Sequence, residues 1–437
     1  MPPANRCGAD PLGRSAIPFY AHPICMVQPP DPYLAARAAR YAVARMMTTP
    51  PGILFTAFEV SGDEHAAPVI DELRRRRPDL PIFALGGPAM RAAGAQVIEE
   101  TTHKAAMLAH AAGQIWEHRR RLARLQRWLA DKPLAALVPV DSPAANWSIC
   151  KLIRRRQPAT RIVHLVAPQI WAWASWRIGR MKRLSDHVLC LLPFEESWFH
   201  QRGVPATFVG HPAFDAQTLA RARGQHLDHP PAGSPRLVLL PGSRMSEIKA
   251  NAPTMLAAWR QLRTRHGTLA TVAALRDPAG ADLFQAVARR CGIDPAQTGI
   301  SVRSGVTDAA LEWGQVVLAV SGTVTLHVAA HARPLVTLYN VPRWQWELVG
   351  RWVVGTRTFT LPNLIGRGLD LSPAVPEFVP HFGAVAPIVT AVQRLLDEPQ
   401  ARQPQLDLFG RIDQAFAGRS YAAAAAQRLL ALLAAPR

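Results

Sequence analysis

The 437-residue chain lacks several features that would place it in common protein classes. Its five cysteines form no C-x-x-C pair, which argues against a disulfide framework or a zinc site and fits a reducing cytosol. No apolar run approaches the roughly 20 residues that a membrane-spanning helix needs. The chain has no Walker A sequence and no G-x-G-x-x-G after a strand, so ATPase and dinucleotide-dependent dehydrogenase functions lose support.

Acidic residues are scarce: 31 Asp and Glu stand against 50 Lys and Arg, giving a net charge of +19. Nucleic acid and anionic lipid surfaces are both candidate partners for such a chain. No motif that combines aromatic and basic residues supports RNA binding, so we predict no nucleic-acid partner. A general bias toward arginine on solvated helix faces is the alternative explanation. The basic clusters lie in the first half of the chain, at Arg74–Arg77, His118–Arg127, Lys151–Arg156 and Arg177–Arg183.

The first 50 residues differ from the rest, since they are rich in proline and alanine and show no strand periodicity. They lack the basic segment and long apolar segment of a secretory signal. We predict that residues 1–50 are a disordered or mis-annotated leader, with natural translation starting at Met46 or Met47.

From residue 52 onward, strand-like and helical segments alternate, which predicts an α/β protein with parallel sheets. The Pro-, Gly- and His-rich segment His226–Pro235 separates two such series. We therefore predict two doubly wound, Rossmann-like domains, 51–225 and 226–415, that face a cleft, and a C-terminal helix, 416–437, that packs on the first domain. The predicted strands are Ile53–Ala57, Ile82–Leu85, Ala135–Val140, Arg161–Val166 and His187–Leu191, then Arg236–Leu239, Ala270–Ala274, Ile300–Val302, Val316–Ala319 and Leu335–Leu338.

Two loops in the second series suit a phosphate ligand: Leu240–Glu247 and Ser321–Leu326. Each small-residue loop joins a strand to a helix, so backbone N–H groups and the positive end of the helix converge there. Arg244 adds a planar fork of donors that a diphosphate can bridge. Either loop alone is more simply a helix cap, but two in one half of the chain predict a nucleotide-diphosphate site.

The loops, in order, resemble those of the lipid-A-disaccharide synthases, which are glycosyltransferases of the B-type fold. The resemblance spans about residues 52–395. The motifs that carry it are Phe58–Asp63, Gly86–Met90, Asp141–Asn146, Ala167–Trp173, Leu192–Glu195, Val209–Pro212, Leu240–Glu247, Ser321–Leu326 and Leu361–Asn363.

The resemblance implies an inverting transfer of 2,3-diacylglucosamine from UDP to the 6-hydroxyl of 2,3-diacylglucosamine 1-phosphate. The product is a β-1,6-linked disaccharide 1-phosphate. Such enzymes use no metal or other cofactor and lie at the cytoplasmic face of the inner membrane. The expected partners are therefore UDP-diacylglucosamine, an acylated glucosamine phosphate and an anionic membrane surface, and a homodimer is left open.

An inverting displacement needs a base for the proton of the acceptor hydroxyl, and Asp141, just after a strand, is the carboxylate that matches the base proposed for the family. No Asp-x-Asp pair is present to hold a metal, so Arg244 and backbone N–H groups must stabilise the leaving UDP. The further catalytic candidates are Glu59 and His211. The candidates for binding UDP or substrate are Ser61, Gly62, Asp63, Gly242, Ser243, Arg244, Glu247, Ser321, Gly322, Thr323, His327 and Asn363.

The chain departs from the family pattern at several positions. His327 stands where the family has a Glu, at a position where B-type transferases commonly hold the ribose, so we expect His327→Glu to tighten UDP binding. Ala144 replaces the second carboxylate of the Asp141 motif, and Pro380 replaces a Gln. These changes leave two alternatives open: a homologue acting on another UDP-sugar, as a transferase or 2-epimerase, or a non-catalytic UDP-sugar or lipid binder.

The segment from Ala105 to Ala130 begins apolar and becomes strongly basic. An apolar patch beside clustered arginines suits the headgroup region of a bilayer. An ordinary amphipathic helix with its arginines in water is the alternative. The predicted membrane contacts are Met107, Leu108, Trp116, Arg119 and Arg120.

Overall fold

The computed structural model describes residues 50–102, 111–141, 143–172, 174–347 and 358–436. These residues belong to one compact unit that begins at Pro50. The predicted leader lies outside the described residues except for its last position, and so do the predicted membrane residues Met107 and Leu108. Their predictions are untested.

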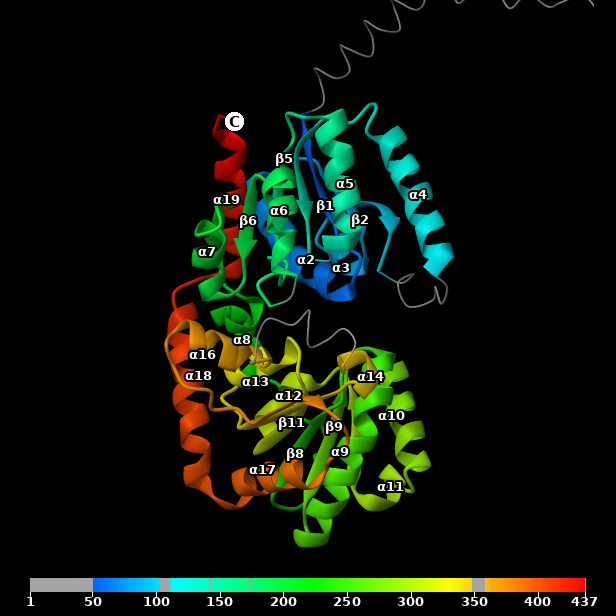
Figure 1. Ribbon diagram of the computed structural model, residues 1–437, viewed down its shortest axis with the longest axis vertical. Helices are drawn as coiled ribbons and strands as arrows, with labels where there is room; N and C mark the ends of the chain where they lie inside the picture. Colours follow the sequence, from blue (N-terminus) through cyan, green and yellow to red (C-terminus); the bar gives the residue numbers. More distant parts are fainter. Residues whose placement is uncertain (1–49, 103–110, 142, 173, 348–357, 437) are drawn as a thin grey trace, which may run out of the picture. The chain divides into compact units, whose positions relative to one another are not determined.

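The first sheet has seven parallel strands in the order β3-β2-β1-β4-β5-β6-β7. Figure 1 labels β1, β2, β5 and β6 of this sheet. The order reverses between β1 and β4, and ligands of doubly wound folds bind at such a switch point, outside the carboxyl ends of the strands. The strands are β1 (Gly52–Thr56), β2 (Ile82–Gly86), β3 (Gln96–Glu100), β4 (Leu134–Pro139), β5 (Arg161–Leu165), β6 (His187–Cys190) and β7 (Ala206–Phe208). The helices are α2 (Val60–Arg76), α3 (Pro88–Ala92), α4 (Ala111–Trp128), α5 (Pro143–Arg156), η2 (Ser175–Arg177), α6 (Ile178–Leu184), α7 (Pro193–His200), η3 (Pro212–Phe214) and α8 (Ala216–Arg223).

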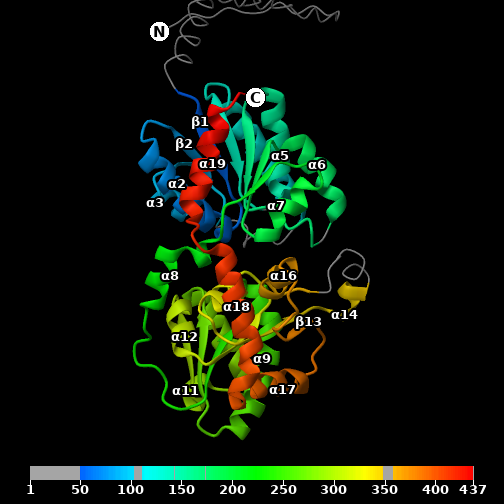
Figure 2. The same ribbon diagram turned by 90° about the vertical axis from the view of Figure 1, so that its left-hand side faces the viewer.

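Helices cover both faces of this sheet. Successive residues of a strand point to opposite faces, so neighbouring apolar residues pack against different helices. Ile53 and Phe55 of β1 pack with residues of α2, whereas Leu54 packs with residues of α4 and α5. Figure 2 shows α5 and α6 on one side of the sheet and α2 on the other. The continuous apolar run of β1 thus reflects a strand buried on both faces.

The second sheet has six strands in the order β10-β9-β8-β11-β12-β13, and its switch point lies between β8 and β11. The strands are β8 (Arg236–Leu240), β9 (Ala270–Leu275), β10 (Ile300–Ser304), β11 (Val316–Val320), β12 (Leu335–Asn340) and β13 (Glu377–His381). The helices are α9 (Met245–Arg265), α10 (Pro278–Arg290), α11 (Pro295–Thr298), α12 (Thr307–Trp313), α13 (Val324–Ala330), α14 (Arg343–Gln345), α16 (Leu361–Gly368), α17 (Ala386–Asp397), η5 (Pro399–Arg402), α18 (Gln403–Phe416) and α19 (Tyr421–Ala434).

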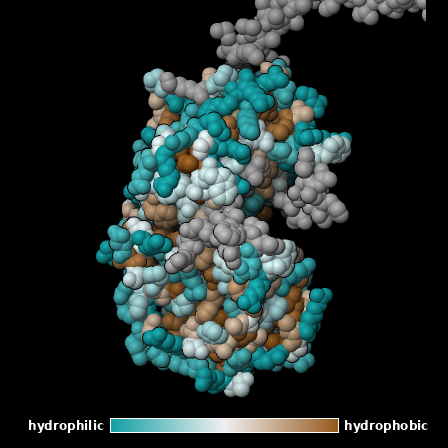
Figure 3. All heavy atoms as spheres, in the orientation of Figure 1, coloured by the Kyte–Doolittle hydropathy of each residue, from teal (hydrophilic) through white to brown (hydrophobic). Residues whose placement is uncertain are grey.

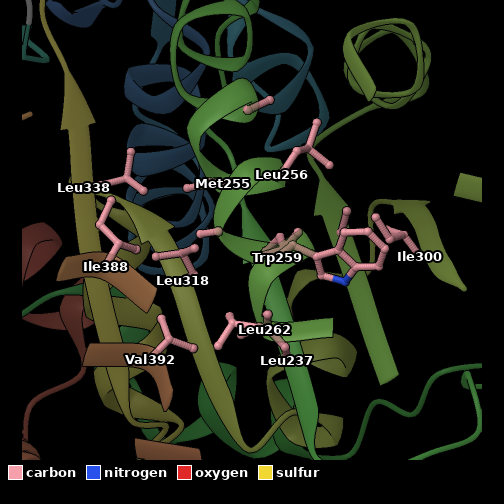
Figure 4. Packing of buried hydrophobic residues seen from close by; sticks show 14 of the residues in the cluster. Leu237, Met255, Leu256, Trp259, Leu262, Ile300, Leu318, Leu338, Ile388 and Val392 are labelled. Atoms are coloured by element: carbon pink, nitrogen blue, oxygen red, sulfur yellow. The ribbon is translucent and has the colours of Figure 1, made fainter. Parts of the chain in front are cut away.

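One face of the second sheet packs around Trp259 of α9, which lies among Leu237, Leu262 and Ile300 (Figure 4). The indole Nε1 donates a hydrogen bond of 2.9 Å to Thr271 Oγ1, so the only polar atom of this side chain is satisfied. The opposite face packs against residues of α12, α13 and α18.

The last helix, α19, packs with the first sheet. Tyr421, Ala425 and Leu429 belong to the same buried cluster as Ile53 and Phe55. The Tyr421 hydroxyl donates a 2.7 Å hydrogen bond to the carbonyl oxygen of His65 in α2. The chain thus returns to its first sheet after completing the second.

The α/β architecture with two parallel sheets is confirmed, and the ends of the predicted strands shift by only one or two residues. Three strands were missed: β3, β7 and β13. Edge strand β3 is polar and half-exposed, β7 has only three residues, and edge strand β13 contains Pro380, so none has the buried apolar run on which the prediction relied. The predicted boundary at 225 stays a prediction, although Leu219 of α8 packs in the cluster of Val238.

Candidate active site

Asp141 directly follows β4 at the switch point of the first sheet, and its backbone is held in an unusual conformation. Its φ is +45°, in the left-handed region that L-residues seldom adopt. The Asp141 N–H donates to the carbonyl oxygen of Leu165 at 3.1 Å. The buried Asn146 donates from Nδ2 to the carbonyl oxygens of Val140 (3.2 Å) and Asp141 (3.0 Å).

Asn146 is itself fixed from the neighbouring strand. The Thr56 hydroxyl, at the end of β1, donates a 2.7 Å hydrogen bond to Asn146 Oδ1, and both residues are fully buried. The hydrogen bonds from Thr56 to Asn146 and from Asn146 to Val140 are buried and the one to Asp141 is partly buried, so the geometry of the Asp141 loop is strongly determined. The partly buried Asp141 is thereby placed at a fixed point of the sheet edge.

A second carboxyl group, Glu195, lies close enough to Asp141 for their charges to interact. Burial raises the pKa of Glu195 to about 7, with a smaller contribution from Asp141, against the opposing effect of its hydrogen-bond donors. Those donors are Trp171 Nε1 (2.9 Å) and the N–H groups of Leu191 (3.1 Å) and Leu192 (2.9 Å). Sequence reasoning did not select Glu195 as a site residue, although it ends a motif that follows a strand.

The loop after β8 brings together three predicted residues: Glu59, Arg244 and Glu247. Arg244 donates from one terminal nitrogen to Glu59 Oε2 at 2.5 Å and from the other to Glu247 Oε1 at 2.9 Å. Gly242, at φ +122°, is required at its position, because an added Cβ would lie 2.6 Å from Glu247 Cβ.

Two N–H groups of this loop have a partner within the chain. Glu247 Oε2 accepts the N–H groups of Ser243 (3.0 Å) and Arg244 (3.2 Å). The N–H of Ser243 is one of the donors predicted for a diphosphate, and in this structure it caps helix α9 together with the N–H of Arg244, through a carboxylate of the same chain. Glu247 therefore shapes the loop, and the exposed guanidinium of Arg244 remains as the group that can reach a phosphate.

The loop after β11 lies at the same switch point, because β8 and β11 are paired neighbours. Ser321 has internal partners: its N–H donates to the carbonyl oxygen of Leu338 (3.1 Å) and its hydroxyl to that of Phe359 (3.1 Å). Gly322 and Thr323 are exposed. The parallel pairing of β8 and β11 thus brings the two predicted phosphate loops to one edge of the sheet.

His327 of α13 belongs to a group of histidines and carboxylates. Its Nδ1 lies 3.9 Å from Asp308 Oδ1, and the buried His331 contacts the same oxygen at 3.2 Å. The two imidazoles hold the pKa of Asp308 well below its usual range. After the larger effect of burial, His327 lowers the pKa of His65, and His65 and then His327 lower the pKa of His211.

His211 is better explained as a structural residue than as a catalytic one. It is buried, and its Nδ1 accepts the N–H of Ala213 at 3.1 Å, which caps the short helix η3. Its ring packs edge-on against that of His65, with centroids 5.6 Å apart. Burial lowers the pKa of His211 well below 6.5, so it is a weak proton acceptor.

Two further candidates are buried and bonded within the protein. The carboxylate of Asp63 accepts the N–H groups of Gly87 (2.8 Å), Ala89 (2.9 Å) and Met90 (3.1 Å), which caps α3. The Asn363 side chain donates to Glu377 and accepts the N–H groups of residues 374 and 375. We therefore assign both residues structural roles rather than ligand contacts.

Ser61 and Gly62 lie in the first turn of α2. A Cβ on Gly62 would meet Ala57 Cβ at 3.1 Å and Val140 Cγ1 at 3.6 Å. Gly62 thus allows α2 to approach the ends of β1 and β4 closely, whereas Ser61 is partly exposed.

The predicted membrane residues that the structure describes lie on α4. Trp116 is 57% exposed, and the Arg120 guanidinium lies 3.2 Å from the centroid of its ring. Arg119 and Arg120 are exposed, whereas Arg121 and Arg124 are paired with Glu99. Within the described ranges, no helix is both long and apolar enough to cross a bilayer.

Solved structures with the same architecture support the fold assignment. The UDP-GlcNAc 2-epimerase of Methanocaldococcus jannaschii, solved with UDP-GlcNAc and UDP, superposes with a TM-score of 0.55 at 12% identity, covering 87% of this chain and 99% of that one. A UDP-forming trehalose-phosphate synthase of Burkholderia xenovorans gives a TM-score of 0.53 at 13% identity, covering 88% and 99%. At these identities the likeness shows the fold alone.

The chain also has curated relatives of similar length. The lipid-A-disaccharide synthase of Solibacter usitatus is 33% identical over 378 residues, covering 85% of this chain and 94% of the relative. The protein of the same name from Myxococcus xanthus is 31% identical over 402 residues, covering 89% and 99%. The family model described as lipid-A-disaccharide synthetase matches residues 53–424, which include both sheets. The chain therefore belongs to the lipid-A-disaccharide synthetase family.

Proposed function

We propose that this enzyme transfers 2,3-diacylglucosamine from UDP to the 6-hydroxyl of 2,3-diacylglucosamine 1-phosphate, forming the β-1,6 lipid A disaccharide 1-phosphate and UDP. The observation that carries the proposal is the family match across residues 53–424. The relatives are themselves named lipid-A-disaccharide synthase and match over most of their length. The 2-epimerase alternative has only a likeness of fold in its favour.

Asp141 is the general base of this proposal. Inversion in a single displacement requires the acceptor hydroxyl to lose its proton as it attacks the anomeric carbon. The support for Asp141 is its place at the switch point after β4 and the hydrogen bond from the buried Asn146 that holds its backbone. A base held in this way needs little reorganisation when the acceptor arrives.

Arg244 binds the diphosphate and stabilises the charge that develops on the leaving UDP. Its guanidinium is already oriented by Glu59 and Glu247, and its side chain is 61% exposed. A diphosphate would replace Glu59 as the partner of one guanidinium edge, because phosphate oxygens offer the same bidentate geometry with more charge. Glu247 would keep its hydrogen bonds from the N–H groups of Ser243 and Arg244.

The membrane surface is the proposed site of action, because diacylated substrates leave a bilayer reluctantly. Trp116, Arg119 and Arg120 supply an aromatic ring and two cations on one exposed helix. The departures at residues 144, 327 and 380 bear on which acyl chains or sugars are preferred. We propose that they tune the substrate preference and that the reaction class is unchanged.

The test is a defined reaction with purified protein, UDP-2,3-diacylglucosamine and 2,3-diacylglucosamine 1-phosphate in detergent, followed by mass spectrometry. We expect disaccharide 1-phosphate and UDP in equal amounts. Asp141→Asn should lower the rate about 10²- to 10⁴-fold while UDP still binds. Turnover of this variant within a few-fold of wild type would exclude Asp141 as the base, and conversion of UDP-GlcNAc without disaccharide would favour an epimerase.

A further inference from the structure

Trp176 is a second exposed tryptophan on the first sheet's helices. It lies in η2, between β5 and α6, and 66% of its surface is exposed. A lone exposed apolar residue is common, so exposure alone shows little. The basic residues around Trp176 distinguish it from such a case.

The segment around Trp176 is strongly basic. Residues 142–194 contain nine Lys or Arg and a single acidic residue, Asp186. That carboxylate is paired with Arg154 at 2.8 Å. The Arg180 guanidinium lies 4.5 Å from the centroid of the Trp147 ring, and Arg177 lies 5.5 Å from it. These two arginines thus contact the buried indole of Trp147, while Arg180 stays exposed four residues after Trp176, in a segment with a single acidic residue.

The chain topology places this segment beside the proposed catalytic loop. Strands β4 and β5 are parallel neighbours, so the connection after β5 that holds Trp176 begins at the same sheet edge as Asp141. The N–H of Asp141 donates to Leu165, the last residue of β5.

The helices α4, α5 and α6 cover one face of the first sheet (Figure 1). Trp116 lies on α4, Asp141 precedes α5, and Trp176 precedes α6. In Figure 3 hydrophilic side chains dominate the part of this face over α5. The exposed Trp116 and Trp176 therefore belong to the elements on either side of the helix that begins at the Asp141 loop.

We propose that Trp176 and Arg180 form a second contact with an anionic phospholipid bilayer, on the other side of the Asp141 loop from Trp116. This inference rests on the proposed function and adds a new surface to it. Indole rings partition into the headgroup region, and each arginine near it gains from anionic lipid. Two contacts, one on either side of α5, orient the Asp141 loop toward substrates whose acyl chains stay in the membrane.

The test is co-sedimentation of the full chain with vesicles of phosphatidylethanolamine and phosphatidylglycerol, compared with vesicles of phosphatidylcholine. Trp176→Ser/Arg180→Glu should lower the partition coefficient into anionic vesicles by on the order of tenfold or more. The matched control is Trp344→Ser/Arg343→Glu on α14, where the tryptophan is 64% exposed beside an arginine. It makes the same charge change and should leave partition within twofold.

Activity measurements separate this inference from the proposed function. With substrates in detergent micelles, the Trp176/Arg180 variant should match wild type, whereas with substrates in vesicles its rate should fall with its binding. Failure of all variants and wild type to make disaccharide would defeat the proposed function, yet the vesicle-binding result would stand. Unchanged partition of the Trp176/Arg180 variant, equal loss in the control variant, or tight binding of RNA without vesicle binding would overturn the inference.

Discussion

The side-chain amide of Asn146 holds the backbone of Asp141 through a 3.0 Å hydrogen bond to its carbonyl oxygen. A non-glycine residue at φ +45° costs conformational energy, and a buried donor aimed at its carbonyl compensates for that cost. Because Thr56 donates in turn to Asn146, a residue of β1 controls the position of a carboxylate that follows β4. The orientation of the proposed base is therefore set across two strands.

Thr56→Val should slow turnover without weakening substrate binding. Valine has the shape of threonine but leaves Asn146 Oδ1 buried and unsatisfied, which costs about 1–3 kcal/mol of stability. The misplaced base should lower kcat about 10- to 100-fold with KM within twofold. Thr56→Ser retains the hydroxyl and should recover most of kcat. Steady-state kinetics of both variants measure these effects. If Thr56→Val is less stable but has an unchanged kcat, the hydrogen bond from Thr56 to Asn146 contributes to stability and not to catalysis.

Glu59→Gln should tighten UDP binding by roughly two- to fivefold, because this pair is partly exposed and its contribution is modest. The carboxylate competes with a diphosphate for Arg244, and an amide competes less. Arg244→Gln should weaken UDP binding at least ~10-fold through the loss of charge-assisted hydrogen bonds. Calorimetry with UDP measures both. The control is Glu64→Gln, which breaks the ion pair with Arg276 and leaves Arg244 intact; a similar gain there would contradict direct competition at Arg244.

His327→Glu alone should weaken UDP binding, in contrast to the expectation from the sequence. The structure places Asp308 Oδ1 3.9 Å from His327 Nδ1, so a glutamate would bring two carboxylates together. The double variant His327→Glu/Asp308→Asn removes that repulsion and should bind UDP more tightly than the single one. Binding that is equal in the two variants would show that Asp308 does not influence residue 327.

Catalysis should survive the removal of divalent metal. The chain has no Asp-x-Asp pair, and the described residues hold no cluster of three or more potential metal ligands. Arg244 and the loop dipoles are the groups proposed to stabilise UDP instead. The measurement is activity after EDTA treatment and desalting; loss of activity that Mg²⁺ or Mn²⁺ restores would refute the prediction.

His164→Leu should make the protein less sensitive to acid. Burial lowers the pKa of His164 to about 3, and neither ring nitrogen has a hydrogen-bond partner among the described residues. The unfolded chain binds a proton below about pH 6.5 and the folded chain does not, so stability from this group is full above pH 6.5 and falls as the pH drops. The stabilising effect of the substitution should be about 2 kcal/mol larger at pH 5 than at pH 8. Urea unfolding of both proteins at the two pH values measures it, and a pH-independent difference would contradict the assignment.

The sequence by itself determined the architecture and the place of the site. Apolar runs such as Ile53–Phe55 are buried on both faces, which is typical of a parallel sheet covered by helices on both sides. Because the small-residue loops follow those runs in the sequence, they lie at the carboxyl ends of the strands. Arg244 was found from this pattern of a strand followed by a polar loop, whereas Asp141 was selected by the resemblance to the family, and its place after a strand agreed with it.

Only the tertiary structure decided which polar residues of those loops serve the fold and which remain for a ligand. Asp63, Glu247 and Asn363 have the same residue types as ligand-binding groups, but their partners are backbone N–H groups brought to them by folding. The proximity of Glu195 to Asp141, and of Asp308 to His327, joins segments far apart in the chain. Whether a carboxylate is bonded internally depends on which backbone donors the packing brings within about 3 Å of it, and no local sequence pattern encodes that distance.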